Sequence, residues 1–194
     1  RTRISPRTFC SRTTSTISRL ILMESARPTP NCRPASGVDE VLASRVFDFD
    51  SKQLMDLLDG AIYGRRFARY VLLRLEYLLA SHAAPLNLPD EISVEHILPR
   101  TPGKTSQWLK DFTEEQREAW LHRLGNLMLL SRRKNTSLGN LDFADKRVRY
   151  FEDRVESLPN SQRLLALGAF TLSDLESRHQ DLLNRLAGSY GAKP

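Results

Sequence analysis

Several features that would assign this sequence of 194 residues to a familiar class are missing or scarce. Only two cysteines occur, Cys10 and Cys32, and they form no Cys-x-x-Cys pair, which argues against a disulfide scaffold and a structural zinc knuckle. No apolar run approaches the roughly 18 residues that a membrane span needs, so we expect a soluble protein. The P-loop pattern and the Gly-x-Ser-x-Gly elbow are also missing, which argues against nucleotide hydrolysis and serine-hydrolase chemistry. The four histidines (82, 96, 122 and 179) show no close pairing along the chain, so a His-rich zinc site is not expected.

Positive charge is concentrated in two stretches. Residues 1–37 contain seven arginines and a single acid, Glu24, and account for the whole formal net charge of +6. Between residues 96 and 150, eleven Lys and Arg residues outnumber six acids. A local surplus of this kind is what a phosphate-binding surface needs, although a solvated charged face has the same composition.

The first 37 residues are rich in Arg, Ser, Thr and Pro and show no sustained hydrophobic period, so we expect a disordered basic extension. The acid-poor first 22 residues imitate the composition of an organellar transit peptide. Since the sequence begins with Arg rather than Met, the alternative that we favour is a fragment or an upstream extension, with Met23 as the true start. Residues 38–194 are expected to form a single domain.

Hydrophobic periodicity predicts mostly helices, with Ser51 as one N-cap and the pair Thr113 and Gln116 as a capping box. The expected helices span residues 38–47, 51–58, 62–81, 114–122, 142–156, 161–168 and 173–187. Two β-like runs cover residues 92–98 and 126–130. The fold class is therefore α+β and mostly helical, with a small strand-containing unit at 91–156 set between a helical part at 38–90 and C-terminal helices at 157–194.

The unit at 91–156 carries the residues with chemical potential. Its first strand ends in Glu95 and His96, and a histidine beside a carboxylate places a general base next to a metal ligand. About thirty residues later, Asn126 starts the second strand, which ends in the basic turn 131–134 and then Asn135. A strand with a histidine, a loop, a second strand and a polar ligand entering a helix is the layout of a ββα-metal finger.

These motifs resemble the HNH, or His-Me finger, endonucleases. Glu-His-Ile-Leu-Pro, then His-x-x-Gly-Asn-Leu-x-Leu-Leu, then Asn135 with Phe143, Lys146 and Tyr150, narrow the resemblance to the C-terminal nuclease domain of GmrSD-type, modification-dependent restriction endonucleases, over about residues 61–187. The resemblance implies a metal-dependent, cytoplasmic DNA endonuclease of a restriction or phage-defence system. It also implies a nucleotide-dependent recognition function, supplied by a separate subunit or by an N-terminal domain outside this sequence.

The resemblance also implies roles for single residues. His96 would be the general base that takes a proton from water, and Asn126 would hold the loop that carries it. Glu95 and Asn135 would bind Mg²⁺ or Mn²⁺. His122 is expected to be structural. The residues expected to contact DNA phosphates are Arg100, Lys104, Arg132, Arg133, Lys134 and Lys146.

Each of these residues also has a simpler interpretation. An isolated histidine on an apolar strand is often a core residue, Gly-Asn favours a plain turn, and Asn135 fits a helix cap. In a regular strand Glu95 and His96 point to opposite faces, so they can work together only if the strand ends or twists there. The alternative function is a catalytically inactive HNH-like module that binds nucleic acid or a partner.

Overall fold

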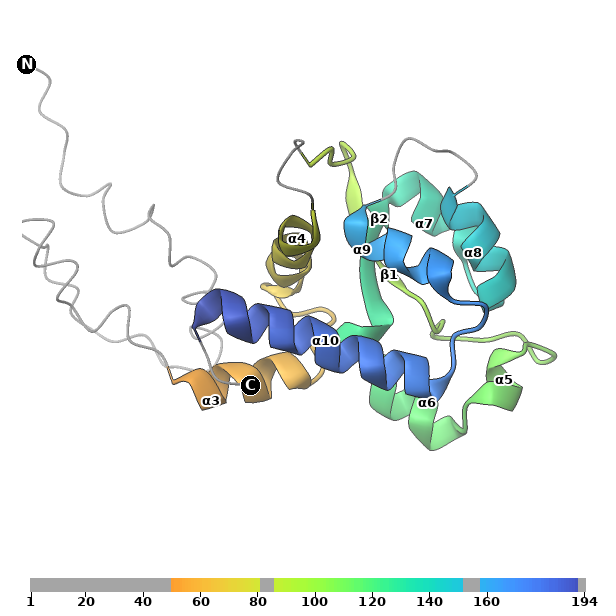
Figure 1. Ribbon diagram of the computed structural model, residues 1–194. Coiled ribbons are helices and arrows are strands. Elements are labelled where there is room, and N and C mark those ends of the chain that lie inside the picture. The colour runs from red at the N-terminus through yellow and green to blue at the C-terminus, as the bar shows by residue number, and fades with distance from the viewer. Residues whose placement is uncertain (1–49, 81–85, 152–157, 192–194) are drawn as a thin grey trace, which may run out of the picture.

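The computed structural model describes residues 50–80, 86–151 and 158–191, in which helices surround a two-stranded antiparallel sheet (Figure 1). The α-helices are α3 (Ser51–Asp59), α4 (Ala68–Leu79), α5 (Trp108–Asp111), α6 (Glu114–Trp120), α7 (Arg132–Leu138), α8 (Phe143–Phe151), α9 (Pro159–Gln162) and α10 (Leu172–Tyr190). The strands are β1 (Ile92–His96) and β2 (Leu127–Ser131), and the 3-10 helices are η3 (Leu124–Asn126) and η4 (Arg163–Ala166). The fold is α+β and mostly helical, as the sequence predicts, while the helix expected over 38–47 lies outside the described residues. Within the described ranges, no helix combines the length and apolar character needed to cross a membrane.

Strand β2 lies at the centre of the fold. All five of its residues are buried, and antiparallel pairing sets Glu95 of β1 opposite Met128. Because successive side chains of a strand point to opposite faces, Leu127 and Leu129 enter one hydrophobic cluster whereas Met128 and Leu130 enter another. The small sheet is therefore covered by apolar side chains on both faces.

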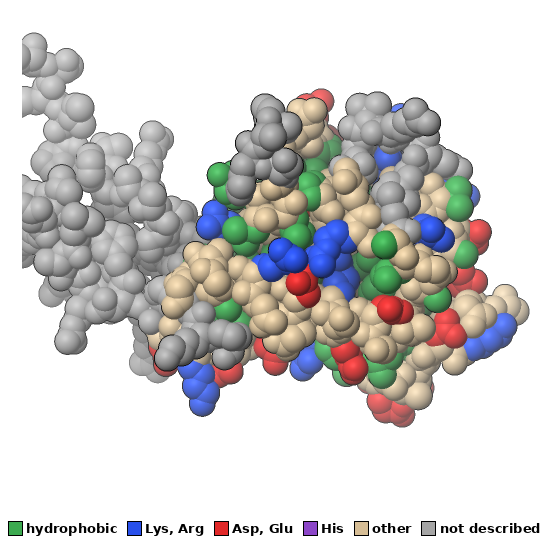
Figure 2. Space-filling view, in the orientation of Figure 1, with side chains coloured by type: hydrophobic (Ala, Val, Ile, Leu, Met, Phe, Trp, Pro, Cys, Tyr) green, Lys and Arg blue, Asp and Glu red, His purple; other side chains and the backbone are tan. Residues whose placement is uncertain are grey.

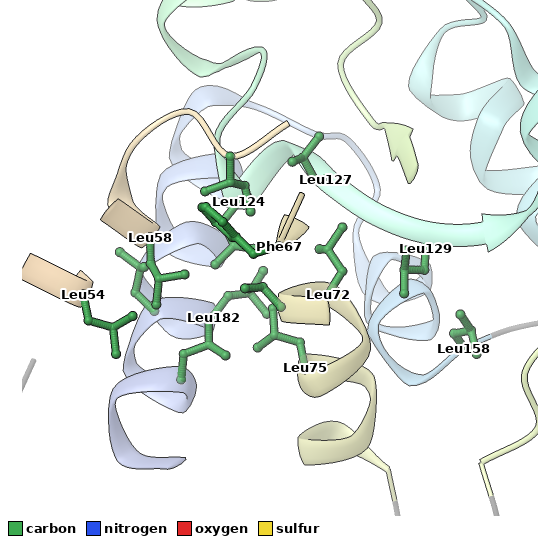
Figure 3. Packing of buried hydrophobic residues seen from close by; sticks show 14 residues of the cluster. Leu54, Leu58, Phe67, Leu72, Leu75, Leu124, Leu127, Leu129, Leu158 and Leu182 are labelled. Atoms are coloured by element: carbon green, nitrogen blue, oxygen red, sulfur yellow. The ribbon is translucent and has the colours of Figure 1, made fainter. Parts of the chain in front are cut away.

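The first cluster joins the sheet to the long helices. Leu58 of α3, Leu72 and Leu75 of α4, and Leu182 of α10 converge beside Leu127, and all five side chains are fully buried (Figure 3). The spacing of three residues between Leu72 and Leu75 puts both on one face of α4. Burying one leucine contributes about 1.5–3 kcal/mol, so this cluster is a main source of stability for the helical part.

The second cluster is aromatic and covers the opposite face of the sheet. The ring of Trp108 packs edge-on against Phe143 and Phe170, at centroid distances of 6.3 and 6.2 Å. Its indole Nε1 donates a hydrogen bond to the carbonyl oxygen of Leu141 (3.0 Å), so the buried ring leaves no polar group unpaired. The short helix α5 starts at Trp108, and the sequence analysis predicted no helix there because four residues carry no helical period.

The expected helix starts are confirmed at one position and corrected at two. Thr113 and Gln116 form the reciprocal capping box that the sequence predicts for α6. Helix α3 is capped by Asp50, one residue before the expected Ser51, because its carboxylate accepts bonds from the backbone N–H groups of residues 52 and 53. Helix α4 begins at Ala68 rather than at residue 62.

The segment after β2 differs most from expectation. Residues 132–138 form helix α7, where the sequence analysis expected a basic turn followed by a loop. Ser131 caps this helix by accepting a hydrogen bond from Lys134 N (3.4 Å), and Gly139 ends it with a φ of 48°. Asn135 therefore lies in the middle of α7, so its interpretation as a helix cap is wrong.

The turn η3 lies against α10 at Gly125. A Cβ atom at residue 125 would meet the Cβ of His179 at 2.6 Å and the carbonyl oxygen of Leu175 at 2.8 Å. Gly125 N donates a hydrogen bond to His179 Nδ1 (3.0 Å), and Arg178 Nε donates to Gly125 O (3.0 Å). The glycine is thus required by the close approach of two backbones.

We predict that Gly125→Ala lowers the free energy of unfolding by about 1–3 kcal/mol, because the added methyl group has no space against α10. Gly168→Ala is the matched control, since a Cβ there would meet no atom within 4 Å. Urea denaturation of both variants measures the effect. Equal midpoints for the two would show that η3 and α10 are not in rigid contact.

Candidate functional site

Strand β1 ends at the two residues on which the site depends. Glu95 and His96 are nearly buried, with 5% and 7% of their surfaces exposed. Their side chains point to opposite faces of the strand, Glu95 toward Lys146 of α8 and His96 toward His122 and Tyr63. The strand ends at His96, and the backbone after it stays attached to the second segment, because Ile97 N donates to Asn126 O (3.0 Å).

Glu95 forms a buried ion pair with Lys146. The ammonium group of Lys146 donates to Glu95 Oε1 (2.6 Å) and to the carbonyl oxygen of His96 (2.7 Å). Burial raises the pKa of Glu95 and lowers the pKa of Lys146, and the attraction between the two groups opposes both shifts. Lys146 is therefore a fully buried link between α8 and the end of β1. The prediction that it lies on a phosphate-binding surface is wrong, because its side chain does not reach the surface.

His96 belongs to a pair of histidines covered by a tyrosine. Its Nε2 atom lies 3.3 Å from Nδ1 of His122. The ring of Tyr63 lies 4.2 Å from that of His96 and is stacked on that of His122 at 5.1 Å. Burial, followed by the charges of His122, Arg100 and Lys146, lowers the pKa of His96 to about 3. The imidazole is therefore neutral at neutral pH, which is the form that accepts a proton.

Asn126 connects the two segments that carry these histidines. Its Oδ1 accepts from Leu98 N (2.7 Å), and its Nδ2 donates to Leu98 O (3.0 Å) and to Leu121 O (2.9 Å). Leu98 lies two residues after His96, and Leu121 lies one residue before His122. The side chain is fully buried, so a plain surface turn does not describe its role.

Asn135 contacts β1 from helix α7. Its Nδ2 donates to Ser93 Oγ (2.6 Å) and to the carbonyl oxygen of Val94 (3.0 Å). These two bonds use both amide hydrogens, which leaves the Oδ1 atom of Asn135 for an external ligand. Ser93 also lines a surface pocket of about 390 Å³, together with charged residues at the start of β1 and on α4 and α7, namely Arg69, Asp90, Glu91 and Arg132.

Glu95 and Asn135, the metal ligands that the resemblance implies, carry oxygen donors of the kind that a hard cation prefers. Mg²⁺ and Mn²⁺ prefer oxygen ligands, and Mg²⁺ commonly binds through one or two protein groups while keeping several waters. Glu95 and Asn135 would supply two oxygens, one of which already accepts a bond from Lys146. Across the described ranges, no three His, Cys, Asp or Glu side chains are grouped so that they could hold a metal ion.

The residues expected to contact phosphates divide into two groups. Arg100, Lys104, Arg132 and Arg133 are exposed, and Arg132 makes a loose ion pair with Glu91 at 3.7 Å. Lys134 is instead 5% exposed and donates to the carbonyl oxygen of Tyr150 (3.1 Å), so its expected place on the surface is corrected, like that of Lys146. None of the described histidines is visible on the face shown in Figure 2.

Two residues of the site were not recognised from the sequence. His122 lies in the motif His-x-x-Gly-Asn but was interpreted as structural, because 26 residues separate it from His96. Tyr63 carried no signal of its own, because it lay inside the helix expected over residues 62–81, where an aromatic residue is typical of the core. Only the fold brings both rings onto His96. The absence of close histidine pairing along the chain therefore said nothing about pairing in space.

We predict that Lys146→Met lowers the free energy of unfolding by about 3–5 kcal/mol, because it leaves the buried carboxylate of Glu95 without its partner. Arg132→Met is the control: it removes an ion pair whose side chains are 74% and 71% exposed, and such surface pairs contribute about 0–1 kcal/mol. Urea denaturation in EDTA gives both values. Equal losses would contradict the buried pairing.

A second prediction concerns the charge of His96, whose pKa is about 3 in the folded protein and near 6.5 when unfolded. Because the folded value is depressed, this group contributes stability that is present above pH 6.5 and is lost as the pH falls toward 3. Ring proton shifts of His96 should be flat between pH 5 and 8 in the folded protein, and should titrate near 6.5 in urea. A midpoint above pH 6 in the folded protein would contradict the prediction.

Comparison with known proteins identifies the family to which this sequence is related. The sequence profile of GmrSD restriction endonucleases, C-terminal domain, matches residues 50–185, which is more than half of the chain. The match covers β1, β2, α7 and α8, and hence every site residue described above. No curated protein and no solved structure gives a match. The chain therefore belongs to the family of GmrSD restriction endonuclease C-terminal domains.

Proposed function

We propose that this protein is a metal-dependent DNA endonuclease of the HNH type that hydrolyses phosphodiester bonds in a restriction or phage-defence system. The observation that carries the proposal is the buried end of β1, where a neutral histidine follows a carboxylate as the next residue. The antiparallel pair β1–β2 leads directly into α7, which is the order of elements in a ββα-metal finger. Membership of the restriction endonuclease family supports the same reaction class.

His96 is the proposed general base. Its imidazole is neutral at physiological pH, and the ring nitrogen that carries no hydrogen is the proposed acceptor for the proton of an attacking water. Asn126 holds the segment after this histidine by its bond to Leu98, and its bond to Leu121 ties that segment to the one that carries His122. We assign Asn126 to positioning, since its amide groups are used by the protein itself.

Glu95 and Asn135 are the proposed ligands of Mg²⁺ or Mn²⁺. When bound, the ion would supply positive charge for the phosphate and for the oxygen that leaves it. Two bonds from its Nδ2 to β1 hold the amide of Asn135, and its Oδ1 would be the atom that binds the ion. Glu95 shares its carboxylate with Lys146, and the hydrogen bond from the ammonium group orients that carboxylate at the buried end of β1.

The proposed DNA surface consists of Arg100, Lys104, Arg132 and Arg133. These exposed cations are supplied by the loop that follows β1 and by the first turn of α7, the two segments that flank Glu95 and Asn135. Contacts of this kind attach to the phosphate backbone and carry little sequence information. The recognition subunit or domain that the resemblance implies would supply the choice of target.

The second candidate is a module that binds nucleic acid without cutting it. One observation favours it, because Lys146 donates to Glu95 at 2.6 Å and so uses one of the oxygens that a metal ion would need. Cleavage therefore requires either that the ion binds the other carboxylate oxygen of Glu95, or that the ammonium group of Lys146 moves away from the first one. The two candidates differ in whether a divalent cation promotes strand cleavage.

We predict that the wild-type protein nicks supercoiled plasmid in Mg²⁺ or Mn²⁺ and not in EDTA. His96→Ala should lower the rate by roughly 10²–10⁴-fold, because a general base is lost, while DNA affinity stays nearly unchanged. Gln180→Ala, at an exposed position of α10, is the control that should cut normally. Undiminished nicking by purified His96→Ala protein would overturn the assignment. DNA binding without cleavage under every metal condition would support the non-cutting module.

A further inference from the structure

His122 lies against the proposed base and is given no role by the reaction described so far. Its Nδ1 atom is 3.3 Å from Nε2 of His96, which is within hydrogen-bond distance for two ring nitrogens. The ring centroids are 5.4 Å apart and the planes are inclined at 63°, so the rings meet through their nitrogens rather than by stacking. The contact is therefore a directed one.

Only one hydrogen can lie between these two atoms, and its location decides whether His96 can act as a base. If the hydrogen belongs to Nε2 of His96, the Nδ1 atom of the neutral ring keeps its lone pair and can accept a proton. If it belongs to Nδ1 of His122, the Nδ1 atom of neutral His96 carries a hydrogen and its only lone pair faces His122. The second arrangement leaves no nitrogen of His96 for water.

We propose that His122 is a positioning residue, whose Nδ1 accepts the Nε2 hydrogen of His96 and so presents Nδ1 of His96 as the atom that takes the proton in phosphodiester hydrolysis. The inference rests on the proposed function for its consequence in catalysis. The tautomer itself is a property of the free protein and is measurable without any reaction. In this arrangement both histidines carry their hydrogen on Nε2.

The fold holds His122 in a fixed place, as a positioning residue requires. Its carbonyl oxygen accepts hydrogen bonds from Ile62 N (2.9 Å) and Tyr63 N (3.2 Å), which attach the segment before α4 to it. The ring of Tyr63 is stacked on His122 with an inclination of 11°, and the same ring packs on His96. Tyr63 therefore restricts the rotation of both imidazoles.

Asn126 fixes the separation of the two histidines from the other side. Its Nδ2 bonds the carbonyl oxygens of Leu98 and Leu121, which flank His96 and His122 in the sequence. Backbone bonding adds to this, because Ile97 N donates to Asn126 O (3.0 Å). These bonds fix the positions of the two histidines by joining the segments at residues 62–63, 96–98, 121–122 and 126. Because both rings are already held, the hydrogen bond between them requires little further ordering of either ring.

The tautomer is tested directly in the wild-type protein. In long-range ¹H–¹⁵N spectra of ¹⁵N-labelled protein at pH 7, protonated and bare ring nitrogens give distinct signals. We expect His96 and His122 both to have a protonated Nε2 and a bare Nδ1. A hydrogen on Nδ1 of His96 would overturn the proposal, whether or not the protein cuts DNA.

Two variants test the consequence. His122→Leu removes the acceptor and should lower kcat about 10–100-fold with KM for plasmid little changed, as expected for loss of a group that orients a site residue. His122→Asn retains an acceptor near the Nδ1 position, so it should recover most of the rate and keep the Nε2–H tautomer of His96. Melting curves of both variants exclude unfolding as the cause.

The outcomes separate this proposal from the proposed function. If the wild-type protein fails to cut, the endonuclease assignment fails while the tautomer measurement still decides the role of His122. If the wild-type protein cuts and folded His122→Leu cuts equally well, the positioning role is overturned and the endonuclease assignment stands. Equal loss in folded His122→Leu and His122→Asn would also contradict positioning by hydrogen-bond acceptance.

Discussion

The amide side chain of Asn126 is the interaction on which the site geometry depends. It is fully buried and makes three hydrogen bonds, two to the backbone of Leu98 and one to Leu121. A buried donor or acceptor that loses its partner costs about 1–3 kcal/mol, so neither segment can move away without penalty. The position of His96 relative to His122 follows from these bonds, and with it the environment that keeps His96 neutral.

A small sheet needs such support because two strands alone are barely stable in water. Here β2 is buried on both faces and paired with β1, and backbone carbonyls near the strand ends accept hydrogen bonds from side chains of neighbouring helices. Arg178 of α10 donates to the carbonyl oxygens of Gly125 and Leu127, at 3.0 and 3.3 Å. Lys146 of α8 does the same for the carbonyl oxygen of His96. The helices therefore orient the strand ends as well as covering them.

The basic residues in the stretch 96–150 include both buried and exposed side chains, and the two kinds have different roles. A Lys or Arg that donates to backbone carbonyls inside the protein is fixed and withdrawn from solvent, as Lys134 and Lys146 are. The exposed ones, such as Arg100 and Lys104, are the cations available to a polyanion. A positive stretch of sequence thus contains both structural and binding residues, and charge alone does not separate them.

The sequence by itself determined the local features, because they depend on residues close together in the chain. A strand starting at Ile92, the capping box of Thr113 and Gln116, and the family resemblance carried by the Glu95–His96 and Gly125–Asn126 motifs could all be read from it, although β1 ends at His96 and not at residue 98. Even the opposite directions of Glu95 and His96 follow from the alternation along one strand.

The tertiary structure decided what depends on contacts across long sequence separations. His96 and His122 are 26 residues apart, Glu95 and Lys146 are 51 apart, and Gly125 and His179 are 54 apart. The pattern of a single helix or strand contains no information about which distant side chain will meet it. Whether a lysine is a phosphate ligand or a buried ion-pair partner is therefore set by packing, since burial decides whether its charge faces water or a carboxylate.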